Sequence, residues 1–178
     1  MKPFPSYRQL DIMDCGPTCL KIIAKYYGRD FSIQKLREKS YITRTGVSML
    51  GISDAAEEIG FRTRGVKITF NQLVSQKPLP CILHWSQNHF VVCYGIKKRK
   101  KKYQLKISDP AGEKYVMDEF DFLKCWISSS SDGESKGMAL LLYPTPKFYQ
   151  QEEDVSSPLN NILLFKEYIK PYKRPIIH

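Results

Sequence analysis

The sequence predicts an α+β fold in which helices come first and an antiparallel sheet follows. Up to Gly60, apolar residues recur at helical spacing, and beyond it come short β-rich runs bounded by Gly, Pro, Asn or charged residues. The chain has 178 residues, of which 42 % are hydrophobic. This length and composition fit one domain with a tail and exclude collagen-like, coiled-coil and low-complexity chains.

Three helices are expected before Gly60. They are predicted over residues 15–27, 32–39 and 48–58. In the first, Leu20 and Ile23 share one face and Pro17 suits the first turn, whereas Ser32 is expected to cap the second. Cys15 is therefore predicted to lie at the N-terminus of a helix.

The remainder of the domain is expected to be mainly strands. Strands are predicted over residues 61–68, 80–85, 89–96, 103–107 and 138–143, short helices over 70–75 and 118–126, and a mobile polar loop over 128–137. After residue 150 the composition resembles a linker followed by a basic amphipathic stretch. We therefore predict a domain over residues 1–150 and a connector over 151–178.

Charge is concentrated in one place. The chain carries 28 Lys and Arg against 18 Asp and Glu, and six of the cations are consecutive at 97–102. This run lies between two predicted strands and has no aromatic residues interleaved with it, so we interpret it as a solvated hairpin tip. Binding of nucleic acid or of an anionic membrane is the alternative interpretation.

The cysteines and the chain start indicate the compartment. Five scattered cysteines suit a reducing environment better than a disulfide framework, and neither they nor the three histidines have zinc-ligand spacing, so no metal site is predicted. The first residues lack the apolar block of a signal peptide, and no apolar run approaches the roughly 20 residues of a membrane span. We expect the chain to remain in the cytosol.

Cys15 is the first residue with possible chemistry. A helix N-terminus stabilises a thiolate, which is the nucleophilic form of cysteine. The alternative is that Cys15 simply packs, as we expect for Cys19. His89, at the start of a predicted strand, is a possible base, and His84 competes with it.

Strand pairing brings an acid toward His89. If residues 97–102 form the turn, Ile96 faces Tyr103 and His89 falls opposite Pro110, next to Asp109. Opposed side chains lie about 5 Å apart at Cβ. A one-residue bulge is needed to bring His89 and Asp109 onto the same face.

Together these residues suggest acyl transfer by a cysteine nucleophile. Cys15 would attack a carbonyl carbon, His89 would hold the proton and give it to the leaving amine, and Asp109 would orient the imidazole. The backbone N–H of Cys15 and the side-chain amide of Gln9 are possible donors to the oxyanion.

Three segments carry a resemblance to a known family. They are Gln-Leu-Asp-Ile-Met-Asp-Cys-Gly-Pro-Thr-Cys-Leu at 9–20, His-Phe-Val-Val at 89–92 and Ile-Ser-Asp-Pro-Ala-Gly at 107–112. In sequence and spacing they resemble the papain-like, bacteriocin-processing double-glycine peptidase domains of peptidase-containing ABC transporters. The resemblance covers residues 1 to about 150.

The resemblance implies a papain-like α+β fold and a set of roles. By residue, it implies Cys15 as nucleophile, His89 as general base and acid, Asp109 as the orienting residue and Gln9 as oxyanion donor. The substrate it implies is a precursor peptide whose leader ends in Gly-Gly, Gly-Ala or Gly-Ser and is bound as an amphipathic helix. Trp85 and Asn88 are possible cleft residues, although a tryptophan in this position is more often core.

The resemblance also implies a larger machine. The peptidase domain itself would need no cofactor, whereas ATP and Mg would belong to a separate nucleotide-binding domain of the transporter. Residues 151–178 would form the linker and the start of an elbow that leads to membrane spans, with the peptidase on the cytoplasmic side. The transporter would be a homodimer and the separate domain a soluble monomer without nucleic-acid partners. A docking module that binds leaders without cutting them, or a different cysteine hydrolase such as an amidase, is the alternative.

Overall fold

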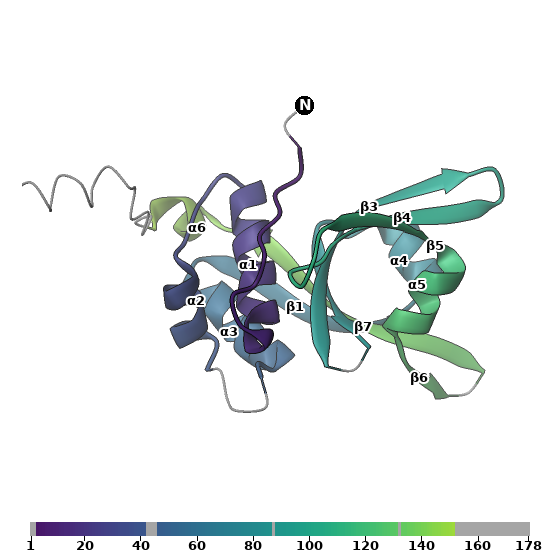
Figure 1. The fold of residues 1–178 in the computed structure, drawn as a ribbon, viewed down its shortest axis with the longest axis horizontal. Coiled ribbons are helices and arrows are strands. Elements are labelled where there is room, and N and C mark those ends of the chain that lie inside the picture. Colours follow the sequence, from purple (N-terminus) through teal and green to yellow (C-terminus); the bar gives the residue numbers. More distant parts are fainter. Residues whose placement is uncertain (1–2, 42–45, 87, 132, 152–178) are drawn as a thin grey trace, which may run out of the picture.

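The computed structural model describes residues 3–41, 46–86, 88–131 and 133–151, and the structural statements below concern these residues. Most of the predicted connector, residues 152–178, lies outside them. The N-terminal part holds a short 3₁₀ turn, η1 (Ile12–Asp14), and the helices α1 (Cys15–Tyr26), α2 (Ile33–Lys39) and α3 (Met49–Glu58). Figure 1 shows these helices grouped at one end of the long axis and the strands extending to the other.

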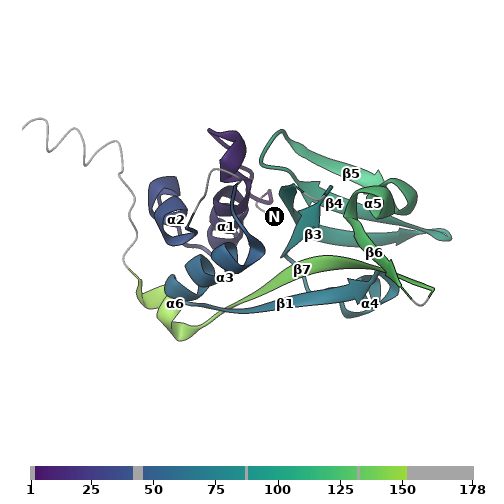
Figure 2. The same ribbon diagram turned by 90° about the horizontal axis from the view of Figure 1, so that it is seen from below.

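The strands form one antiparallel sheet. They are β1 (Phe61–Thr69), β2 (Cys81–Trp85), β3 (His89–Arg99), β4 (Lys102–Ser108), β5 (Lys114–Asp118), β6 (Ile127–Ser131) and β7 (Glu134–Pro144). Their order is β1-β7-β2-β3-β4-β5, and β6 pairs with β7. Three further helices are α4 (Phe70–Gln76), α5 (Glu119–Trp126) and α6 (Pro146–Gln150). The two views show a strongly curved sheet, with α4 and α5 on the side away from α1 (Figures 1 and 2).

The centre of the sheet is buried on both faces. Along β3, Phe90 and Val92 pack into a core shared with α1, α2, α3 and α6, whereas Val91 and Cys93 pack into a second core with α4 and α5. This alternation is the two-residue period of a strand. It explains why residues 90–93 of β3 are apolar without interruption, because both faces of this part of the strand are covered.

The α+β prediction is confirmed, and the helix boundaries agree closely with those expected. Ser32 caps α2 by accepting a hydrogen bond from the Lys35 backbone N–H at 3.3 Å. Gly60 follows α3 with φ of +99°, and a Cβ there would lie 2.5 Å from the Cα of Phe148. Glycine is therefore required at this position both by conformation and by space.

One predicted loop is wrong. The polar segment 128–137 contains most of β6 and the start of β7, which pair as a hairpin. The serine-rich composition indicated a loop, but the backbone of this segment forms the hydrogen bonds of an antiparallel strand pair. Gly137 lets the Trp126 ring lie flat on the strand, since a Cβ at Gly137 would meet the indole Nε1 at 2.7 Å.

Two short elements, β5 and α6, were not predicted, and the β3–β4 hairpin is longer than expected. Its strands reach Arg99 and begin again at Lys102, so the turn consists of Lys100 and Lys101. The interpretation of the basic run as a hairpin tip is confirmed. Within the described ranges, every helix is too short or too polar to traverse a lipid bilayer.

Candidate active site

Cys15 is the first residue of α1 and is 5 % exposed. The short turn η1, which precedes Cys15, is stabilised by a local cap. The Asp11 carboxylate accepts a hydrogen bond from the Met13 backbone N–H at 2.9 Å. Gly16 allows α3 to approach closely, since a Cβ at this position would meet Ile52 Cδ1 at 2.6 Å. The thiol is thus held at the end of a helix whose N-terminus is packed against its neighbour.

The residue before Cys15 anchors the same turn. Asp14 is fully buried, and its Oδ1 lies 3.0 Å from Nε of Arg37 in the last turn of α2. A buried carboxylate needs a cation as its partner. This ion pair ties the N-terminus of α1 to α2.

His89 and Asp109 are in direct contact. The imidazole Nε2 lies 2.7 Å from Oδ1 of Asp109, which also accepts a hydrogen bond from the Ala111 backbone N–H at 2.8 Å. The Tyr115 hydroxyl donates to the other carboxylate oxygen at 3.4 Å. Asp109 is therefore held by three donors, including the ring it orients.

The predicted bulge is confirmed at a register other than the one expected. Near the turn Ile96 pairs with Leu105 rather than with Tyr103, and the register shifts by one residue between Cys93 and Gly95. Beyond the shift Val92 pairs with Ser108, which places Asp109 diagonally across from His89. Diagonal neighbours on one face are within reach of long side chains.

Two opposing effects set the protonation of this pair. Burial alone would lower the pKa of His89, but hydrogen bonds to Asp109 and Cys15, with the negative charges of both, raise it to about 9. Burial alone would raise the pKa of Asp109, but the hydrogen bonds from His89 and Ala111 outweigh it and lower the pKa. At neutral pH the imidazole is therefore protonated and the carboxyl ionised, and Cys15 is near enough to the ring to contribute to the raised pKa.

Gln9 lies in the segment that leads into η1. Its backbone N–H donates to the Pro110 carbonyl at 2.8 Å, which pins this segment to the residue that follows Asp109. The side-chain Oε1 is buried and has no hydrogen-bond partner among the described residues. The structure thus brings Gln9 to the loop of Asp109.

A cleft of about 810 Å³ opens beside Cys15. Asn88 lines it, as predicted, and so does His84, whose ring centroid is 5.3 Å from that of Phe90. The apolar lining, which no sequence motif marked, comes from Ile12, Met13, Val47, Met49, Phe90 and Met138.

Trp85 does not line the cleft, so its prediction as a cleft residue is wrong. It is 6 % exposed and belongs to the second core, where its ring lies edge-on to Phe122 with centroids 5.4 Å apart. His84, its neighbour along β2, lines the cleft, and neighbours along a strand point to opposite faces, so the Trp85 indole points away from the cleft into the second core.

Cys19 behaves as a packing residue. It is fully buried, and its thiol donates to the Phe90 carbonyl at 3.3 Å. Burial raises the pKa of this thiol well above its usual value, which keeps it in the unreactive protonated form. Among the described residues, no group of three or more His, Cys, Asp or Glu could hold a metal ion.

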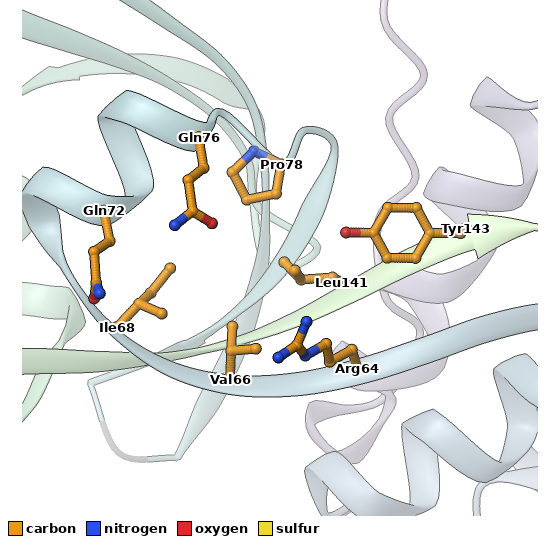
Figure 3. Close-up of a pocket in the computed structure, with 8 residues that line it drawn as sticks. All are labelled: Arg64, Val66, Ile68, Gln72, Gln76, Pro78, Leu141 and Tyr143. Atoms are coloured by element: carbon orange, nitrogen blue, oxygen red, sulfur yellow. The ribbon is translucent and has the colours of Figure 1, made fainter.

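A second cavity, of about 540 Å³, lies elsewhere on the molecule (Figure 3). Its walls come from β1, α4 and β7, and its residues are Arg64, Val66, Ile68, Gln72, Gln76, Pro78, Leu141 and Tyr143. It contains none of the candidate site residues and neither a cysteine nor a histidine. Cys15, the candidate nucleophile, lines the other cleft instead.

Curated proteins are similar to this sequence. The probable microcin-H47 secretion/processing ATP-binding protein of Escherichia coli is 29 % identical over 160 residues, which are 89 % of this chain and 21 % of that protein. The lactococcin-G-processing and transport ATP-binding protein of Lactococcus lactis subsp. lactis is 33 % identical over 145 residues, 78 % of this chain and 18 % of that protein. The chain thus spans about a fifth of the length of these curated relatives.

Solved structures share the fold. The peptidase domain of Streptococcus ComA, a bi-functional ABC transporter in a quorum-sensing pathway, has a TM-score of 0.66 and 32 % identity, covering 80 % of this chain and 100 % of that one. A double-glycine-motif protease from an AMS/PCAT transporter, solved with its leader peptide, has a TM-score of 0.65 and 26 % identity, covering 79 % and 91 %.

The family resemblance seen in the sequence is confirmed. Residues 4–130 match the model of the Peptidase C39 family, and this range contains Cys15, His89 and Asp109. The chain therefore belongs to the peptidase C39 family of cysteine peptidases.

Proposed function

We propose that this chain is the domain of a transporter that removes the leader of a bacteriocin or related precursor peptide after a Gly-Gly, Gly-Ala or Gly-Ser site. One observation carries the proposal: the 2.7 Å contact between His89 and Asp109, with Cys15 near enough to the imidazole to help raise its pKa. The printed names of relatives, which include processing proteins and a double-glycine-motif protease, support the substrate class.

Each residue has a role in the proposed reaction. The Cys15 thiolate attacks the scissile carbonyl carbon, and the oxyanion accepts hydrogen bonds from the Cys15 backbone N–H and the Gln9 side chain. His89 gives its proton to the leaving amine, which departs as the mature peptide. His89 then takes a proton from water, whose oxygen attacks the thioester and releases the leader with a free carboxylate.

Asp109 acts through His89. Because Nε2 of the ring faces Asp109, Nδ1 is left for Cys15, and the ring is fixed in the orientation that proton transfer requires. The negative carboxylate also favours the imidazolium that pairs with the thiolate.

Small residues at the cut site suit the cleft. Met13, Val47 and Phe90 line it beside Cys15, and we infer that these bulky side chains exclude substituents larger than a methyl or hydroxymethyl group near the scissile bond. Asn88, at the same cleft, is available to hydrogen-bond the peptide backbone.

The wider setting is part of the same proposal. The full-length protein would be a homodimeric ABC transporter, with this domain on the cytoplasmic side and residues 151–178 leading toward the membrane spans. ATP and Mg would act in the separate nucleotide-binding domain, and cleavage in this domain would require no cofactor.

Cleavage of a precursor with a Gly-Gly leader, followed by mass spectrometry, tests the proposal. We expect a single cut after the glycine pair, abolished in Cys15→Ala and retained in Cys125→Ala, which removes a half-buried cysteine outside the site. A leader with a bulky residue in place of the second glycine should not be cut.

Other outcomes would favour the alternatives. Leader binding without cleavage by the unaltered chain would support a docking module. Cleavage by Cys15→Ala would exclude Cys15 as the nucleophile, and cleavage of the bulky leader would favour a different cysteine hydrolase.

A further inference from the structure

Cations from three strands gather on one face of the sheet, because paired residues share a face and every second residue returns to it. The pairs that define this face are Arg99 with Lys102, Lys97 with Gln104, Gly95 with Lys106 and Ser108 with Lys114. Its cations, which we call the basic face, are Lys97, Arg99, Lys102, Lys106 and Lys114. Lys106 and Lys114 lie outside the run at 97–102, so the charged surface in the structure is larger than the run alone would form.

Little negative charge opposes the basic face. Among the described residues, its four cations on β3 and β4 form no ion pair, and Lys114 donates to the Phe4 carbonyl at 2.8 Å. Asp118 opposes Gln104 on the same face. Val116, opposite Lys106, is 55 % exposed and adds an apolar group beside the cations.

A groove of about 1260 Å³ adjoins the basic face. Lys97, Lys106 and Lys114 line it together with the N-terminal segment, and no Asp or Glu is among the described residues of its lining. Cations that share a groove without acids concentrate positive potential there. The basic face and the adjoining groove should therefore attract anions along their whole length.

The spacing and the side-chain types indicate the kind of anion. Arg99 and Lys102 face each other across the strands at about 5 Å, and alternate residues such as Lys97 and Arg99 lie about 7 Å apart, a spacing that suits a surface of headgroup phosphates. Aromatic rings that line the groove already pack on one another, since Phe4 stacks on Tyr94 with centroids 4.2 Å apart and lies 5.3 Å from the ring of Tyr26. Free rings for stacking bases are typical of single-stranded nucleic-acid sites.

We propose that the basic face docks this chain on an anionic membrane surface, with lipid phosphates as partners of its cations. The choice of a membrane rests on the proposed function, in which the chain is part of a membrane transporter. The β3–β4 hairpin projects from one end of the long axis and α6 lies at the other (Figure 1). Contact through the hairpin would thus add a second point of attachment, distant from the one that follows α6.

Co-sedimentation of the 178-residue chain with vesicles tests this. The vesicles contain phosphatidylcholine alone or with about 30 % phosphatidylglycerol. We expect binding to the anionic vesicles only, and weaker binding as the ionic strength rises from about 0.05 to about 0.5 M. The variant Lys97→Gln/Arg99→Gln/Lys102→Gln should lower the apparent affinity about tenfold or more.

Two matched variants remove the same charge elsewhere. Lys98→Gln/Lys100→Gln/Lys101→Gln changes the turn and the opposite face of the same hairpin, and Arg62→Gln/Lys67→Gln/Lys147→Gln changes exposed cations on β1 and α6. Both should bind more tightly than the variant of the basic face. Equal losses in the two hairpin variants would overturn the assignment to one face.

Other results would overturn the membrane itself as the partner. These are equal binding to both kinds of vesicle, or binding to a single-stranded RNA oligonucleotide without binding to vesicles. Cleavage of a free precursor in the same samples reports on the proposed function separately and should be unchanged in all three variants. An unaltered chain that binds anionic vesicles but cuts no precursor would refute the peptidase proposal alone.

Discussion

The proton on His89 is the residue-scale feature on which the proposed chemistry depends. Its imidazole side chain is 22 % exposed and that of Asp109 17 %, so water screens their interaction only in part. The carboxylate favours the imidazolium, and the pKa of His89 accordingly rises to about 9 although burial opposes it. Below that pH the ring carries the proton that the leaving amine needs, and above it the proton is lost.

The variant Asp109→Asn should therefore move the alkaline limit of activity. With an uncharged partner, the pKa of His89 should fall from about 9 toward the ordinary histidine value of about 6.5. We expect kcat/KM for precursor cleavage to be lower by about 10²-fold or more and to decline at correspondingly lower pH than in the unaltered chain. The measurement is the pH profile of kcat/KM.

Tyr115→Phe is the matched control for this profile. It removes only the 3.4 Å hydrogen bond from the phenol to the carboxylate and leaves the charge of Asp109 in place, so the alkaline limit should move little. If Asp109→Asn kept the alkaline limit of the unaltered chain, Asp109 would not be what raises the pKa of His89.

At the scale of elements, the N-terminus of α3 forms one edge of the cleft. Ser48 lines the cleft and also caps α3, because its hydroxyl oxygen accepts a hydrogen bond from the Gly51 backbone N–H at 3.0 Å. The cap satisfies one of the N–H groups that a helix start leaves without a partner. This edge is therefore held by a local interaction that a single substitution removes.

Ser48→Ala should lower the free energy of unfolding by about 1 kcal/mol. Urea denaturation followed by circular dichroism measures this, and Ser48→Asp, which retains a capping oxygen, should restore most of the loss. A Ser48→Ala chain as stable as the unaltered one would mean that the cap contributes nothing to α3.

The elements also explain how much the sequence alone could predict. Helices marked by Ser32, Ser48 and Gly60 were located closely because capping residues and glycine act locally. The hairpin β6–β7 was missed because the residues that pair in it are mostly Ser, Lys and Glu, and backbone pairing orders them without an apolar pattern. Trp85 was misplaced for a related reason, since only the fold decides which face of a doubly buried strand meets the cleft.

The candidate site shows the same division. Cys15, His89 and Asp109 could be predicted because their residue types are those of a cysteine nucleophile, a base and an orienting acid. The alternation of faces along the hairpin also predicted a bulge between His89 and Asp109, and the structure contains one between Cys93 and Gly95. The apolar lining, including Val47 and Met138, has no such signal. Side chains of this kind are ordinary core residues until the topology gathers them beside a thiol.

At the scale of the whole molecule, the site lies where the helices meet the sheet. Cys15 belongs to α1, whereas His89 belongs to β3 and Asp109 follows β4. The core beneath them is continuous from α1 to β7 and includes Phe148 of α6. The packing of that core thus sets the position of Cys15 relative to His89. The same core predicts where the domain ends.

The variant Phe148→Ala tests whether α6 completes this core. Phe148 is fully buried, with its ring centroid 4.4 Å from that of Phe61 and 6.0 Å from that of Phe31. Its truncation should lower the free energy of unfolding by about 3–5 kcal/mol, as measured in urea. Tyr149→Ala, in the same helix but 51 % exposed, should change it by about 0.5 kcal/mol or less.

The same reasoning locates the end of the domain. A chain that ends after Gln151 retains the Phe148 contacts and the hydrogen bond from the Thr145 backbone N–H to the Gly60 carbonyl at 3.1 Å, and should unfold at the same urea concentration as the 178-residue chain. A chain that ends after Pro144 loses both, and should be destabilised at least as much as Phe148→Ala. Equal stability of all three chains would place the boundary before α6, because the first core would then be complete without it.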